Sequence, residues 1–115
     1  MISVGIDLVD TSRIRSLYER YGEKFLNLIY SKRELEEWYQ RGQPIEYLAG
    51  RFALKEAFIK AAGHYIPWRS IEILADTTGK PKLLHRGKPI SGSLSVSHEG
   101  NLAIGIVIYE DHSIH

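Results

Sequence analysis

Residues 45–62 read IEYLAGRFALKEAFIKAA, and this stretch decides the fold. It carries many apolar residues, no proline and a single interior glycine, Gly50. Pro44 suits the first position of a helix, while Gly63 and Pro67 are residues that end one. The pattern therefore predicts a long central helix over residues 45–62.

Two charged residues of this helix stand out. At about 100° per residue, Glu56 and Lys60 fall within the apolar stripe of the helix. Charged side chains are depleted from core faces because the loss of water is costly unless a partner or a metal compensates. An i,i+4 ion pair at the edge of the stripe would explain both residues, and a functional site is the alternative.

Before the central helix, the sequence predicts one strand followed by shorter helices. Residues 2–9 alternate like a strand, and Asp10 suits the cap of a helix that follows. Ser31 and Glu34 have the spacing of a capping box, which opens a further helix ending near Gly42.

After the central helix, the apolar period changes to two. Strands are expected at residues 70–75, 82–85, 93–98 and 102–109, and residues 110–115 are expected to fray. This order predicts the α+β class: a small, mostly antiparallel sheet packed with a long central helix and shorter helices.

The 115 residues, with 43% hydrophobic and 25% charged, suit a single domain over residues 1–115. A chain of this size leaves apolar faces that favour oligomers. The absence of cysteine excludes disulfides, thiolate metal ligands and a cysteine nucleophile, leaving oxygen and nitrogen ligands for any metal.

Charge and hydropathy also limit the partners. A formal charge of +1, from 15 Lys and Arg against 14 Asp and Glu, gives no field that would attract nucleic acid. The amino terminus meets Asp7 too early for a signal peptide, and no segment is long enough for a membrane span. We therefore expect a cytoplasmic protein that binds neither nucleic acid nor membrane.

Asp7 is a carboxylate in an otherwise apolar strand, and Gly5 on the same face leaves space beside it. A carboxylate from a strand, brought against a second one from a helix, makes a hard oxygen site suited to Mg²⁺. The alternatives are that Asp7 caps a turn or forms an ion pair with Arg13.

Two polar patterns have both a functional and a structural explanation. Ser93, Ser95, Ser97 and His98 run into a turn and could collect phosphate oxygens, although a solvated strand face gives the same string. The basic residues around Arg13 in the early helices could form a solvated face or dock an acidic partner.

Together, three segments resemble the holo-acyl-carrier-protein synthase family of small phosphopantetheinyl transferases, in the right order over almost the whole chain. They are Gly5-Ile6-Asp7 followed by Arg13-Ile14, the block from Leu48 to Ala61, and Ser95-Val96-Ser97-His98. The Phe-x-x-Lys-Glu-Ala-x-x-Lys-Ala spacing within the central block is the most specific of the three.

The resemblance implies that the chain transfers 4′-phosphopantetheine from coenzyme A to a serine of apo acyl carrier protein, leaving adenosine 3′,5′-bisphosphate, in fatty acid biosynthesis. It implies that Asp7 and Glu56 bind Mg²⁺ and that Lys60 faces the phosphates, these three forming the catalytic set. Either Glu56 or a metal-bound water would take the serine proton.

The resemblance also assigns Arg51 and His98 to the 3′-phosphate of coenzyme A and Arg13 to docking of the acidic carrier protein. The family is homotrimeric with sites between subunits, so His98 would complete a site whose carboxylates belong to a neighbour. Residues 63–69 look shorter than the family's loop at this point, a departure that bears on the cofactor pocket.

Two other functions fit the same residues. In a non-catalytic oligomeric binding module, Glu56 and Lys60 would be an ion pair only, and no magnesium would be required. A small nucleotide hydrolase would use the same carboxylates without a protein acceptor.

Overall fold

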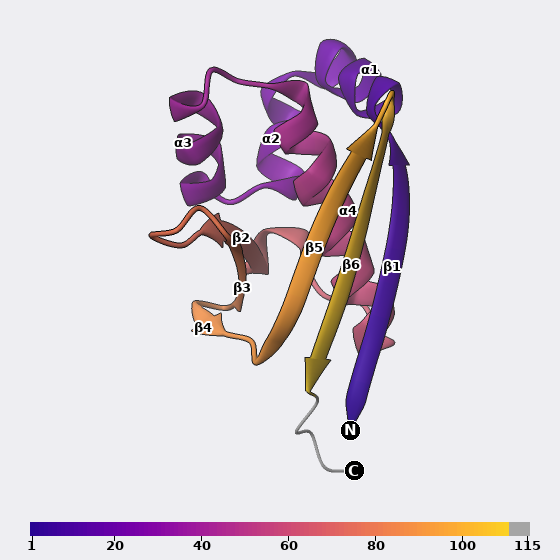
Figure 1. Ribbon diagram of the computed structural model, residues 1–115. Coiled ribbons are helices and arrows are strands. Elements are labelled where there is room, and N and C mark those ends of the chain that lie inside the picture. Colours follow the sequence, from indigo (N-terminus) through magenta and orange to yellow (C-terminus); the bar gives the residue numbers. More distant parts are fainter. Residues whose placement is uncertain (111–115) are drawn as a thin grey trace.

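A computed structural model of the protein describes residues 1–110 (Figure 1). Strand β1 (Ile2–Asp10) leads into the helices α1 (Thr11–Tyr21), α2 (Glu23–Ile29), α3 (Lys32–Gln40) and α4 (Ile45–Ala62). A short 3-10 helix η1 (Trp68–Ser70) then precedes β2 (Ile71–Ala75), β3 (Pro81–His85), β4 (Lys88–Pro89), β5 (Gly92–Glu99) and β6 (Leu102–Glu110). Of the tail expected to fray, Glu110 belongs to β6, and residues 111–115 lie outside the described residues.

The strands form two antiparallel sheets with the orders β1-β6-β5 and β2-β3-β4. In the first sheet, Asp7 lies opposite Gly105 and Gly5 opposite Val107. The α+β class with antiparallel sheets and a long central helix is therefore confirmed. The sequence did not predict η1 or the two-residue β4, because neither is long enough to show a period.

Local signals account for the ends of the helices. The Asp10 carboxylate accepts a hydrogen bond from Ser12 N at 2.9 Å and caps α1, as expected. Ser31 and Glu34 form the predicted capping box of α3. Pro44 stands one residue earlier than expected, at the N-cap of α4, and Gly63 ends that helix at a φ of 78°.

Small residues bring α4 onto the first sheet. A Cβ added at Gly5 would lie 1.8 Å from Ala57 O, and one at Gly105 would lie 2.9 Å from Ala53 C. The helix and the strands therefore meet backbone to backbone, and α4 lies directly behind the β1-β6-β5 sheet (Figure 1). This close approach allows side chains of β1 and α4 to share one edge of the sheet.

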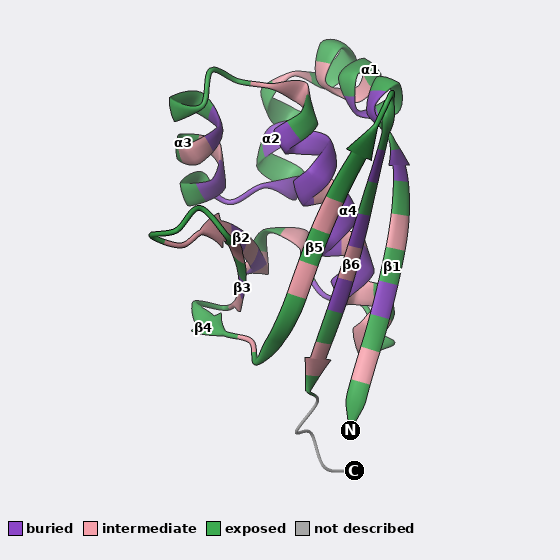
Figure 2. Ribbon diagram, viewed as in Figure 1, coloured by how far each residue is buried: buried purple, intermediate pink, exposed green. Residues whose placement is uncertain are grey.

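The prediction that Glu56 and Lys60 lie within a buried apolar stripe of α4 was wrong. Lys55 and Arg51 are buried, whereas Glu56 is half-buried and Lys60 is exposed. The reason is that α4 is covered on two sides, by the first sheet and by the layer that contains α2, α3 and β2 (Figure 2). A periodicity that assumes one buried face cannot describe such a helix.

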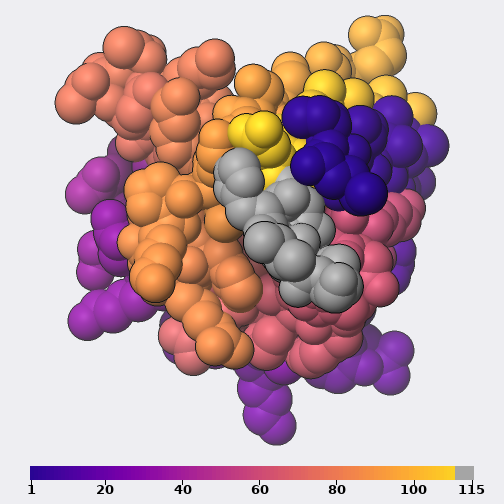
Figure 3. Space-filling model, turned by 90° about the horizontal axis from the view of Figure 1, so that it is seen from below, coloured from indigo at the N-terminus to yellow at the C-terminus, as the bar shows by residue number. Residues whose placement is uncertain are grey.

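The other face of the first sheet is apolar and open. On β1, the side chains of Ile2, Val4, Ile6 and Leu8 are 58–62% exposed, and Leu102, Ile104 and Ile108 of β6 extend the same surface. The start of β1 and the end of β6 lie side by side in the end-on view (Figure 3). We call this surface, formed by the seven residues named here, the open sheet face.

Candidate functional site

Asp7 and Lys60 meet at the β1 edge of the sheet. The Lys60 ammonium donates to Asp7 Oδ1 at 2.9 Å and to Ile6 O at 3.2 Å. The hydrogen bond and the charge of Asp7 raise the pKa of Lys60, and the Glu56 carboxylate adds to this rise. The fold therefore brings Asp7 to Lys60, with the Glu56 carboxylate close enough to Lys60 to affect its pKa. Sequence reasoning placed these three residues in one site.

These contacts bear on the alternatives for each residue. The ion pair of Asp7 is made with Lys60 and not with Arg13. Lys60 is likewise in direct contact with Asp7, so a simple pair with Glu56 does not describe it. A shallow hollow opens over the pair, lined by Ile6, Asp7, Leu8, Lys60 and Ile104.

The two carboxylates can be tested as ligands for a divalent cation. Among residues 1–110, no three His, Asp or Glu side chains gather closely enough to hold a metal by themselves. Mg²⁺, however, commonly takes only one or two protein carboxylates and completes its shell with water and substrate phosphates. Asp7 and Glu56 therefore fit Mg²⁺ with a phosphate ligand and do not fit a metal held by protein atoms alone.

A second hollow lies near the β5 edge of the sheet, with a volume of about 320 Å³. Its lining includes Arg51 and His98, two predicted site residues, together with Arg41, Tyr47, Gly79 and Pro81. A Cβ at Gly50 would lie only 3.3 Å from His98 Nε2, so the glycine makes room for the imidazole. Sequence reasoning missed Arg41 and read Gly79 and Pro81 only as a turn, because nothing local connects them to His98.

Arg51 is held rigidly at the wall of this second hollow. Its Nη2 donates to Glu37 Oε1 at 2.9 Å, its Nε donates to Ile73 O at 3.1 Å, and its guanidinium lies 4.3 Å from the Tyr47 ring centroid. Burial acts to raise the pKa of Glu37, but hydrogen bonds from Ala75 N and Tyr47, with the charge of Arg51, hold that pKa below its ordinary value. Arg51 is therefore part of a buried network as well as a wall of the hollow.

The two groups of site residues lie at opposite edges of the sheet. Asp7 belongs to β1 and His98 to β5, with β6 between them. Two strand spacings separate these edges by about 10 Å, and α4 packs between the two groups. One chain therefore does not bring His98 to Asp7 and Glu56.

The serines of β5 do not share a site with His98 either. Ser93, Ser95 and Ser97 pair with Ile108, Ile106 and Ile104, whose side chains lie on the side of the sheet away from α4. His98, one position on, points to the face covered by α4, in contact with Gly50. The three hydroxyls therefore belong to the solvated strand face that sequence reasoning considered as an alternative.

Arg13 is exposed on α1, where its guanidinium lies 6.0 Å from the centroid of the Phe52 ring. Phe52 also closes one end of an almost wholly apolar hollow of about 380 Å³. The rest of that lining is Leu17, Tyr21, Lys24, Phe25, Leu28 and Ile29. A basic group thus stands beside an apolar depression.

Comparison with known proteins gives the class of the chain. Residues 3–107 match the model of the 4′-phosphopantetheinyl transferase superfamily. The chain is 43% identical to the holo-[acyl-carrier-protein] synthase of Chloroherpeton thalassium, with 95% of this chain and 98% of that protein covered. It is 40% identical to the same enzyme from Chlorobaculum tepidum, again with 95% of this chain and 98% of that protein covered.

Solved structures give the same answer. The structure of holo-[acyl-carrier-protein] synthase from Neisseria meningitidis superposes with a TM-score of 0.85 at 38% identity, covering 96% of this chain and 100% of that one. The Helicobacter pylori enzyme, solved in complex with coenzyme A, gives a TM-score of 0.81 at 28% identity, covering 93% of this chain and 99% of that one. The chain belongs to the 4′-phosphopantetheinyl transferase superfamily, and within it to the holo-acyl-carrier-protein synthases, which confirms the resemblance inferred from the motifs. None of its described helices has the length and apolar character needed to cross a bilayer.

Proposed function

We propose that this phosphopantetheinyl transferase moves 4′-phosphopantetheine from coenzyme A to a serine of apo acyl carrier protein. The products are the holo carrier protein and adenosine 3′,5′-bisphosphate, and the reaction serves fatty acid biosynthesis. The observation that carries this proposal is the meeting of Asp7 with Lys60, beside Glu56, within a chain of this family. Single-domain action of residues 1–115 and a cytoplasmic location belong to the same proposal.

The proposal includes dependence on magnesium, with Asp7 and Glu56 as the protein ligands. Supporting it is the character of the donors, two carboxylates that leave most coordination positions to phosphate and water. When bound, Mg²⁺ would offset the negative charge that builds up on the pyrophosphate during transfer.

Within the chain, Lys60 is the cation that faces the phosphates. Its side chain is 51% exposed, so the ammonium can reach a substrate without leaving a buried position. A positive group already in place beside the pyrophosphate stabilises the charge of the transition state and orients the phosphorus for attack by the serine oxygen. Glu56, half-buried next to Lys60, also lies where it could accept the proton of that serine.

The 3′-phosphate of coenzyme A is assigned to the second hollow. Arg51 and His98 line it, and Arg41 adds a cationic side chain that is 43% exposed. Glu37 Oε1 pairs with Arg51 at 2.9 Å and with Arg41 at 3.8 Å, so two guanidinium groups share one carboxylate and a positive charge remains for a phosphate. Both arginines and the imidazole can donate hydrogen bonds to phosphate oxygens.

The proposal includes a homotrimer, and the separation of the two groups of site residues supports association of the chain. Because Asp7 and His98 lie at opposite edges of one sheet, a complete site takes the β1 edge from one chain and the β5 edge from a neighbour. The open sheet face supports association, since monomers rarely leave so continuous an apolar surface in water. Three copies would complete three equivalent sites.

Docking of the carrier protein is assigned to α1. Arg13 supplies the positive charge that an acidic partner would meet, and the apolar hollow beside it offers a place for an aliphatic side chain. Electrostatic attraction of this kind acts mainly on the rate of encounter and on the choice of partner.

The test is incubation of the protein with coenzyme A and an apo carrier protein, with and without Mg²⁺, followed by intact mass of the carrier. The proposal expects a carrier heavier by one phosphopantetheine only when all components are present. Breakdown of coenzyme A without any change in the carrier would indicate a nucleotide hydrolase. Carrier binding without any chemistry would indicate a binding module.

A further inference from the structure

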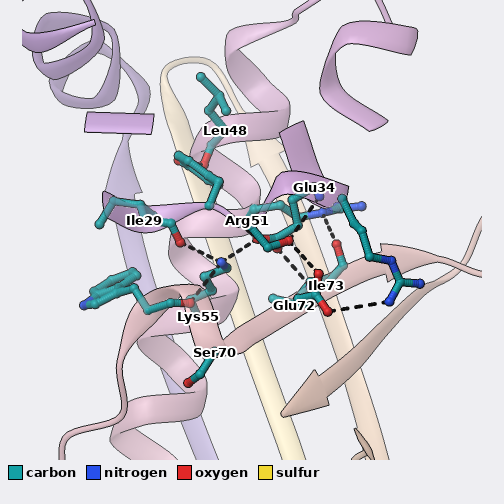
Figure 4. Close-up of polar contacts among 12 residues, drawn as sticks. Ile29, Glu34, Leu48, Arg51, Lys55, Ser70, Glu72 and Ile73 are labelled. Carbon is teal, nitrogen blue, oxygen red and sulfur yellow. Dashed lines mark hydrogen bonds and ion pairs between the residues drawn. The ribbon is translucent and has the colours of Figure 1, made fainter. Parts of the chain in front are cut away.

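The residue that precedes Glu56 is a fully buried lysine. The Lys55 ammonium donates to Ile29 O at 2.7 Å, to Trp68 O at 3.1 Å and to a carboxylate oxygen of Glu34 (Figure 4). An ammonium has three N–H groups, so each of them has an acceptor. The three acceptors come from the end of α2, from η1 and from α3, which means that one side chain joins α4 to three separate elements.

Glu34 extends this connection to the second sheet. Its Oε1 accepts a hydrogen bond from Ser31 N at 2.9 Å, and its Oε2 accepts one from Ile73 N in β2 at 2.9 Å. Burial raises the pKa of Glu34 and lowers the pKa of Lys55, and the attraction between the two groups opposes both changes. The side chains of Lys55 and Glu34 are both 0% exposed.

A buried ion pair is a weak source of net stability, because removing two charges from water offsets most of their attraction. The two groups must nevertheless stay in contact, because a buried charge that loses its partner is strongly unfavourable. The Lys55–Glu34 pair therefore has more influence on how α4 is oriented than on whether α4 is buried.

The opposite side of α4 lies close to the sheet where Glu56 is held. There the helix meets Gly5 and Gly105 through the backbone of Ala57 and Ala53, while side-chain packing on this side comes from residues such as Phe58, whose ring lies 5.2 Å from that of Tyr109. A contact between small, smooth surfaces permits rotation and sliding more easily than one with side chains in grooves. The three hydrogen bonds of Lys55 thus fix the rotation of α4 at the residue next to Glu56.

From this arrangement we propose that Lys55 is a positioning residue for the transfer reaction. By engaging Ile29, Trp68 and Glu34 at once, it sets the rotation of α4 and so the direction of Glu56 and Lys60 toward Asp7. The proposal rests on the proposed roles of Glu56 and Lys60. Lys55 itself is buried and does not touch the substrate.

The test compares Lys55→Met with the double variant Lys55→Met/Glu34→Gln. The single variant leaves the Glu34 carboxylate buried without its cation, so it loses folded structure or stability. The double variant has no lone buried charge, and the single amide oxygen of its glutamine can accept the hydrogen bond from either Ser31 N or Ile73 N. The double variant is therefore the one in which kcat and metal binding are measured, at a temperature below its melting temperature, so that loss of folding does not contribute.

For the double variant we expect kcat to fall about tenfold or more, because misplaced catalytic groups lose much of their effect. KM for the carrier protein stays within about twofold, since docking uses α1. We expect the affinity for Mn²⁺ alone, measured by electron paramagnetic resonance, to fall roughly tenfold, because mutations that disorient metal ligands weaken metal binding by about this much. A role in stability alone would change neither kcat nor Mn²⁺ binding.

Tyr30→Phe is the matched control. It removes a different buried hydrogen bond to the same helix, from the Tyr30 hydroxyl to Leu48 O at 2.6 Å, two turns before Glu56. It should lower stability and leave kcat and Mn²⁺ binding as in the wild type. A folded double variant with wild-type kcat and wild-type Mn²⁺ binding would overturn the role of Lys55. Normal transfer by Glu56→Ala would instead overturn the site on which the role depends.

Discussion

The Lys60 ammonium lies 2.9 Å from Asp7 Oδ1, and so joins two residues 53 positions apart in the sequence. The Asp7 side chain is only 12% exposed, whereas that of Lys60 is 51% exposed. A carboxylate held by the sheet is thus paired with a cation that retains freedom to move toward a ligand. This relationship gives the first prediction.

Lys60→Met should reduce transfer and at the same time strengthen the binding of Mn²⁺ alone. Lys60 contacts the Asp7 carboxylate that we propose as a metal ligand, so removing the ammonium should remove a competitor of the cation. An ion pair this exposed is weak, and we expect a gain of about threefold in affinity, measured by isothermal titration calorimetry. Lys88→Met, on exposed β4, is the control. Weaker Mn²⁺ binding by Lys60→Met would contradict the competition.

Glu56→Ala should lower transfer about 100-fold or more and largely preserve the fold. The side chain is half-buried, so its removal takes away the proposed metal ligand and very little packing. Intact mass of the carrier protein reports the transfer, and thermal unfolding reports the fold. Glu36→Ala removes an exposed carboxylate of α3 and should transfer like the wild type. Near-normal carrier modification by Glu56→Ala would refute the metal assignment.

Val4→Asp should give a monomer without transferase activity. Val4 is 58% exposed on the open sheet face, opposite Ile108, and a carboxylate that association would bury there would oppose association. Size-exclusion chromatography with light scattering measures the mass of the assembly. Tyr39→Ser changes an exposed side chain on α3, outside the sheet, and should leave the assembly intact. An active monomer would mean that one chain completes the site.

Gly5→Ala should destabilise the protein by about 3 kcal/mol or more. The new Cβ would lie 1.8 Å from Ala57 O, and backbone on both sides prevents relief. Gly100→Ala meets open space and only an unfavourable φ of +55°, for a loss of about 1 kcal/mol. Urea unfolding ranks the two variants, and equal losses would show that α4 can move away from β1.

His85 should make stability fall as the pH is lowered through about 6.5, the ordinary pKa of histidine. Burial, with Arg86 and His64 nearby, lowers the pKa of His85 in the folded state. The unfolded chain then binds more protons, so acid favours unfolding and neutral pH favours the fold. His85→Gln should reduce the loss of unfolding free energy between about pH 7.5 and 5.5. An unchanged loss in His85→Gln would refute the assignment.

Much of the fold could be predicted because its signals are local. The capping box at Ser31 and Glu34, the cap at Asp10 and the end of α4 at Gly63 each depend on residues within one helical turn. The motif around Glu56 and Lys60 likewise indicated the family before any contact was known. Each of these features lies within a short window of the chain.

Burial on α4 and the completeness of the site were decided only by the tertiary structure. The sequence by itself determined the elements, their order and the candidate residues Asp7, Glu56 and Lys60. Burial of Lys55 instead of Lys60 depended on which layers cover each side of α4, and the separation of Asp7 from His98 depended on β6 lying between β1 and β5. Periodicity records the spacing of side chains along one element, whereas burial and distance depend on partners that arrive from remote parts of the chain.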